Sequence, residues 1–69
     1  MILFQYNDCI VIHQGRREIV PMDSECGRAI RALMSVSYDL YDALPDVNRA
    51  EKRAIYNLVD SQAMTIITG

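Results

Sequence analysis

The stretch Arg17–Ile30, REIVPMDSECGRAI, contains a change from a strand pattern to a helix pattern. Before Pro21 the residues are β-branched or suited to a strand, and proline ends the strand because it has no backbone N–H to donate. After Pro21, Asp23 and Ser24 are both good helix N-caps, and apolar residues then recur with helical spacing. The stretch therefore predicts a sheet up to Pro21 and helices after it.

The residues before Pro21 predict an antiparallel meander of three short strands, because three runs rich in β-branched and aromatic residues alternate with turn residues. The predicted strands lie at about 2–6, 9–14 and 17–21. We expect turns at Asn7–Asp8, where both residues tolerate positive φ, and at Gly15–Arg16, where glycine suits a type II′ turn. This second turn would place Ile12 opposite Ile19, and both faces of the sheet would be apolar.

The residues after Pro21 predict two antiparallel helices, at about 24–44 and 48–67. Pro45 separates them, and Asn48–Glu51, NRAE, resembles a capping box that starts the second. In the first helix one apolar stripe recurs at spacings of three and four residues, and we expect it to face the core. The stripe consists of Met22, Cys26, Ala29, Leu33, Val36, Leu40 and Ala43, and Ile30, Met34, Tyr41 and Leu44 widen it to about half of the helix surface. The fold class is thus α+β, in a single small domain spanning residues 1–69.

The polar face of the first predicted helix carries its charges in an order that opposes the helix dipole. Arg28 and Arg31 lie near its start, and Asp39 and Asp42 lie near its end. These charges are symmetric about Ser35, so two copies crossing there antiparallel would pair each arginine with an aspartate. A solvated face, or an oligomer held by the apolar faces instead, is the alternative. The candidate dimer contacts are Arg28, Arg31, Ser35, Tyr38, Asp39 and Asp42.

The size of the chain favours self-association. It has 69 residues, no tryptophan and one phenylalanine. A domain of this size buries only about 60% of the surface that its unfolded chain exposes, and oligomerisation is a common way to bury more. We therefore expect a homo-oligomer. Two cysteines without a signal-peptide pattern fit reduced thiols and a cytoplasmic location, and no apolar stretch is long enough to span a bilayer.

The sequence offers no recognisable catalytic or metal-binding set. His13 is the only histidine, and on one strand it would lie about 13 Å from Cys9, too far for a thiolate–imidazole pair. Two scattered cysteines and one histidine do not have the usual spacing of zinc ligands. Asp39 and Asp42 share a helix face, but paired catalytic carboxylates must flank a substrate cleft. We expect no enzyme activity, no metal and no cofactor.

The charged residues favour an interaction protein. The net charge of −2 argues against a protein that simply coats nucleic acid, and six arginines to one lysine favour directed pairing. We therefore expect a non-enzymatic, self-associating protein that binds a larger protein and inhibits or modulates it, as small inhibitors of phages and mobile elements do. The candidate binding residues are Arg16, Arg17, Arg28, Arg31, Tyr38 and Arg53.

Two other classes of binding protein remain open. The first is an oligomer that sequesters an anionic nucleotide-like ligand, with arginines on the phosphates and a tyrosine stacked on the base. The second is a small DNA-binding regulator that uses Arg16 and Arg17. Its element order, the strand REIV followed by two helices, is similar to that of ribbon-helix-helix repressors. The acidic net charge and the two extra strands depart from that pattern.

Overall fold

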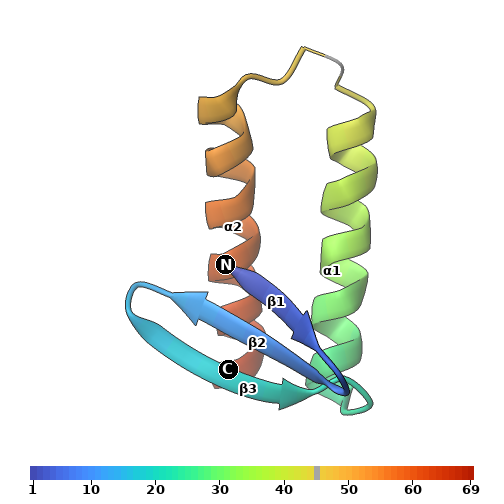
Figure 1. Ribbon diagram of the computed structural model, residues 1–69, viewed down its shortest axis with the longest axis vertical. Helices are drawn as coiled ribbons and strands as arrows, with labels where there is room; N and C mark the ends of the chain where they lie inside the picture. Colours follow the sequence, from blue (N-terminus) through green and yellow to red (C-terminus); the bar gives the residue numbers. More distant parts are fainter. Residues whose placement is uncertain (45) are drawn as a thin grey trace.

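The computed structural model describes residues 1–44 and 46–69, which form a three-stranded sheet followed by two antiparallel helices (Figure 1). The antiparallel strands are ordered β1-β2-β3. The elements are β1 (Ile2–Gln5), β2 (Asp8–His13), β3 (Arg16–Pro21), α1 (Glu25–Asp42) and α2 (Arg49–Thr68). The predicted α+β fold is confirmed. The predicted break at Pro45 lies outside the described residues.

Both hairpin turns begin one residue earlier than predicted. In the first turn Tyr6 has φ 54°, the sign that a type II′ turn requires at its first central residue. In the second, Gln14 and Gly15 have φ 50° and 76°, the signs that a type I′ turn requires at both central residues. Ile19 consequently lies opposite Ile10, and the predicted pairing of Ile12 with Ile19 is wrong. The register shift of two residues leaves every side chain on its predicted face, because side chains alternate with a period of two.

The observed register aligns the core residues of the sheet. Cys9 lies opposite both Phe4 of β1 and Val20 of β3, so one row of side chains on the inner face points toward the helices. The buried core combines this face with residues from both helices. Its buried members are Cys9, Val11, Val20, Ile30, Ala63 and Met64.

The sheet crosses only part of the helical hairpin, near the start of α1 and the end of α2 (Figure 1). The rest of the hairpin, residues 35–42 and 49–57, extends past the sheet, and we call it the overhang. The Cα radius of gyration is 12.1 Å. A compact chain of this length would have about 11 Å, so the overhang makes the molecule elongated.

The predicted core stripe of α1 is only partly buried. Cys26 and Leu33 pack against the core, but Val36 is 63% exposed and Leu40 is 53% exposed. Ile30, one of the residues predicted to widen the stripe, is fully buried. The helix is therefore rotated from the expected orientation, and most of the stripe after Leu33 points away from the sheet.

The close approach of α1 to the end of β3 explains this rotation. Ser24 is the N-cap, and its side chain accepts a hydrogen bond from Gly27 N at 3.0 Å and donates one to Pro21 O. A Cβ atom on Gly27 would lie 2.2 Å from Pro21 O and 2.8 Å from Met22 Cα. Only glycine allows the backbones to pack this closely, so the side of α1 that carries Gly27 and Ile30 meets the sheet.

Gly27→Ala should lower the free energy of unfolding by about 2–3 kcal/mol, because the added methyl group meets backbone atoms that cannot move aside cheaply. In an unhindered helix the same change would stabilise by about 1 kcal/mol. Urea denaturation followed by circular dichroism at a fixed protein concentration measures the difference. Gly15→Ala is the control: it faces open space and should cost only about 1 kcal/mol through its positive φ. An equally or more stable Gly27→Ala protein would contradict the packing argument.

Candidate binding groove

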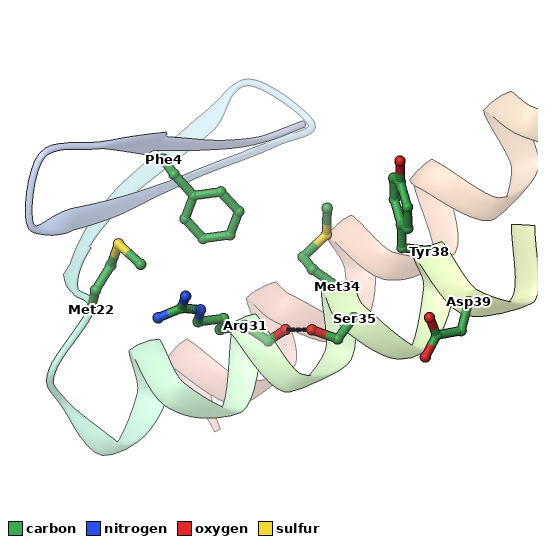
Figure 2. Close-up of a pocket in the computed structure, with 7 residues that line it drawn as sticks. All are labelled: Phe4, Met22, Arg31, Met34, Ser35, Tyr38 and Asp39. Carbon is green, nitrogen blue, oxygen red and sulfur yellow. Dashed lines mark hydrogen bonds between the residues drawn. The ribbon is translucent and has the colours of Figure 1, made fainter. Parts of the chain in front are cut away.

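The overhang and the sheet together form a concave surface with two adjoining grooves that share Met34. The first, which we call the apolar groove, has a volume of about 550 Å³ and lies between β1 and α1. Figure 2 shows the Phe4 ring reaching from β1 toward α1, with Met22 on one side of it and Met34 and Tyr38 on the other. The lining residues are Phe4, Met22, Arg31, Met34, Ser35, Tyr38 and Asp39.

The second groove, which we call the basic groove, has a volume of about 990 Å³ and lies between β1 and α2. Three cationic side chains from the first turns of α2 line it. Its one carboxylate, Asp60, is 6% exposed and forms an ion pair with the α-amino group of Met1. The lining residues are Met1, Ile2, Met34, Arg49, Ala50, Lys52, Arg53, Tyr56, Asn57 and Asp60. The cationic side chains therefore dominate the charge of this groove.

Aromatic contacts order one wall of the basic groove. The rings of Tyr41 in α1 and Tyr56 in α2 have centroids 6.4 Å apart and are tilted by 34°. Lys52 Nζ lies 5.0 Å from the centroid of the Tyr41 ring, within the range of a cation–π interaction. Tyr56 remains 54% exposed, so its ring can also contact a ligand.

The free edge of β1 runs along both grooves. Ile12 N donates to Met1 O at 2.8 Å and Ile12 O accepts from the α-amino group of Met1, so these two residues form a hydrogen-bonded pair of the ladder. Hydrogen-bonded pairs alternate with non-bonded pairs in an antiparallel ladder. The N–H and C=O groups of Ile2 and Phe4 consequently point away from β2, toward the free edge. Their side chains line the basic groove and the apolar groove, respectively.

The structure brings some of the predicted binding residues together and separates others. Arg31 and Tyr38 line the apolar groove, and Arg53 lines the basic groove. Arg28 is exposed and lines neither groove. At the β2–β3 hairpin, Arg16 Nε lies 3.4 Å from Glu18 Oε1, and Arg17 is exposed beside it.

Four of the six predicted dimer contacts lie on one wall, because Arg31, Ser35, Tyr38 and Asp39 all line the apolar groove. Ser35 Oγ donates to Arg31 O at 3.1 Å and so points back along its own helix (Figure 2). A symmetric crossing of two copies at Ser35 stays a prediction, as do the contacts of Arg28 and Asp42.

Sequence reasoning identified four of the seven residues that line the apolar groove and one of those that line the basic groove. Phe4, Met22 and Met34 were assigned to a sheet face or a helix stripe, and their convergence depends on the tertiary fold. The basic cluster could have been found, since Arg49, Lys52 and Arg53 follow one another at helical spacings of three and four residues.

The two cysteines and His13 lie in different surroundings. Cys9 is fully buried, and the loss of hydration around its thiolate raises the pKa of its thiol. Cys26 is half-buried and its Sγ lies 3.9 Å from Ile66 O, so it faces α2. His13 Nε2 lies 3.2 Å from Ser61 Oγ. Within residues 1–44 and 46–69, no three His, Cys, Asp or Glu side chains are placed to hold a metal ion.

Neither described helix combines the length and the apolar composition that crossing a membrane requires. Comparison of the chain with protein-family models, curated proteins and solved structures found no match.

The two cysteines should differ in their reaction with a small thiol reagent. Cys9 should react at least about tenfold more slowly than Cys26 in the native protein, because the reactive thiolate of Cys9 is both covered and disfavoured by burial. Mass spectrometry of the Cys9→Ser and Cys26→Ser variants gives the two rates separately. In denaturant the rates should converge. Similar rates in the native protein would mean that the core around Cys9 opens readily.

Proposed function

We propose that the protein is a non-enzymatic interaction module that binds an extended, acidic segment of a larger protein and thereby inhibits or modulates that protein. The observation that carries this proposal is the free edge of β1, which runs along an apolar groove and a basic groove.

A partner strand can pair with this edge through its backbone. The outward-pointing N–H and C=O groups of Ile2 and Phe4 are the groups that an added strand uses in β-augmentation. Alternate side chains of such a strand would point into the grooves, because successive residues of a strand face opposite sides. The backbone hydrogen bonds would contribute affinity for any extended segment, and the contacts of its side chains with the grooves would determine sequence specificity.

The charges of the grooves define the partner segment. Arg49, Lys52 and Arg53 favour acidic side chains near Ile2. Near Phe4, the methionines and Tyr38 favour an apolar or aromatic side chain. The expected segment therefore combines an apolar residue with one or more carboxylates.

Selection from a library of random extended peptides tests this expectation. The enriched peptides should carry carboxylates and an apolar residue, and they should bind more weakly at high salt. Arg53→Glu should weaken their binding at least about tenfold, because one attractive contact becomes a repulsive one. Arg28→Glu, which makes the same charge change outside both grooves, is the matched control and should leave binding nearly unchanged. Equal effects of the two variants would contradict the proposed site.

A proline substitution tests the strand edge itself. Phe4→Pro removes an N–H group that points outward, so the pairing of β1 with β2 keeps its hydrogen bonds. Phe4→Ala is the control for loss of the ring. Fluorescence anisotropy should show that Phe4→Pro binds selected peptides roughly tenfold more weakly than Phe4→Ala, the effect of about one hydrogen bond. Equal affinities would exclude backbone pairing at this edge.

The basic groove also favours a second candidate function, the sequestration of an anionic nucleotide-like ligand. Its volume of about 990 Å³ is sufficient for such a ligand, and the half-exposed Tyr56 ring lies among three cationic side chains. Calorimetry with nucleoside triphosphates distinguishes the two functions. Nucleotide binding would be lost in Tyr56→Ala and kept in Phe4→Pro, whereas peptide binding along β1 requires the edge.

A further inference from the structure

The side of the helical hairpin that faces away from the sheet is mostly apolar, and we call it the back face. In α1 and its C-cap it consists of Ala29, Val36, Leu40 and Ala43, with Leu33 at its border with the core, and in α2 of Ile55, Leu58, Gln62 and Ile66. With Leu33 included, the spacings are four, three, four and three residues in α1 and three, four and four in α2. This is the spacing that places residues along one seam between packed helices.

Helix geometry places these residues opposite the grooves. Each residue advances about 100° around a helix, so Val36 lies about 200° from Met34, and Leu58 lies about 200° from Asp60. Met34 and Asp60 line the grooves on the sheet side of the hairpin. Val36 and Leu58 therefore point to the other side, where they are 63% and 59% exposed.

The charge distribution of the back face fits a second copy of the same chain. The middle of this face carries no charged side chain and one polar side chain, Gln62, whereas Glu25 and Glu51 lie one turn before Ala29 and Ile55, at its two ends. The basic residues of α2 lie in the basic groove instead. The middles of two identical faces can therefore meet without repulsion between like charges, as a twofold contact requires.

The monomer exposes more surface than its mass predicts, and the excess is about as large as the surface that one partner buries in a dimer. A monomeric protein of 7.9 kDa is expected to expose about 4,400 Å², whereas this chain exposes 5164 Å². The excess of about 750 Å² is close to the roughly 800 Å² per partner that a standard stable interface buries. On the outer face of the sheet, the exposed residues Leu3 and Ile19 flank the buried Ile10 in one row.

We propose that a second copy of this chain packs on the back face, hairpin against hairpin, to form a four-helix bundle with one sheet on each outer side. The side chains around Val36 and Leu58 form the centre of the contact. The grooves lie on the sheet side of each hairpin, so both remain open in the dimer. The inference depends on the helices alone and not on what the grooves bind.

Sedimentation equilibrium of matched variants tests this proposal. The wild-type protein should sediment at twice the chain mass of 7.9 kDa. Val36→Glu should raise the dimer dissociation constant at least about a hundredfold, because a charge would be buried in an apolar contact. Ile19→Glu, on the outer face of the sheet, is the matched control because Ile19 and Val36 are exposed to 60% and 63%. It should leave the dimer intact. Circular dichroism should show that both variants keep the fold, since both side chains are exposed in the monomer.

Three outcomes would overturn the proposal. One is a wild-type protein that stays monomeric at about millimolar concentration. Another is a dimer that survives Val36→Glu and dissociates in Ile19→Glu, which would place the contact on the sheet. The third is efficient disulfide crosslinking of Ser35→Cys in a Cys9→Ser, Cys26→Ser background, since facing cysteines crosslink only within about 7 Å. That result would place the twofold axis at Ser35, on the wall of the apolar groove.

Discussion

The close contact between Gly27 and the end of β3 determines how the rest of the molecule is arranged. Because a Cβ atom at this position would meet Pro21 O, the backbone of α1 can lie against the sheet only on the side that carries Gly27 and Ile30. That rotation places Arg31, Met34 and Tyr38 beside β1, where they line the apolar groove. The same rotation turns Val36 and Leu40 to the back of the hairpin. One backbone contact thus determines which side of α1 lines the apolar groove and which side forms the exposed apolar face.

The small size of the sheet leaves part of both helices uncovered. Three strands of four to six residues cover only part of two helices of 18 and 20 residues, so the overhang has no sheet beneath it. The uncovered helices would be poorly stabilised alone, because most helical stability in proteins comes from tertiary packing. On the sheet side, aromatic rings and cationic side chains of the overhang face the edge of β1. On the back, aliphatic side chains remain without a partner in the monomer, which makes the two surfaces suited to different kinds of binding.

Local patterns predicted the elements well and their orientation poorly. Ser24 and Asn48 cap their helices as expected, with Asn48 Oδ1 accepting from Glu51 N at 2.9 Å, because capping depends on residues three positions apart. Both turns were misplaced by one residue. In the second turn Gly15 suits either of two overlapping turns, and pairing across the strands decides between them. The apolar stripe of α1 was expected to face the core, and only its first part does, because periodicity alone does not say what a stripe packs against. Phe4 reaches Met34 only through the tertiary fold, which no local pattern contains.

The charges of both helices oppose the helix dipole, and the grooves suggest why such an arrangement persists. Arg49, Lys52 and Arg53 lie in the first turns of α2, where the helix end is already partially positive, so they reduce the stability of the helix. The Asn48 cap and Glu51 offset this cost only in part. All three cationic side chains line one groove, together with the exposed Tyr56 ring. Cationic side chains at the positive end of a helix strengthen the positive potential there, and a bound carboxylate or phosphate would neutralise it. Departures from local stability rules gather at functional sites in folded proteins. If the proposed binding occurs, an anionic group held at the N-terminal half of α2 would offset this loss of helix stability.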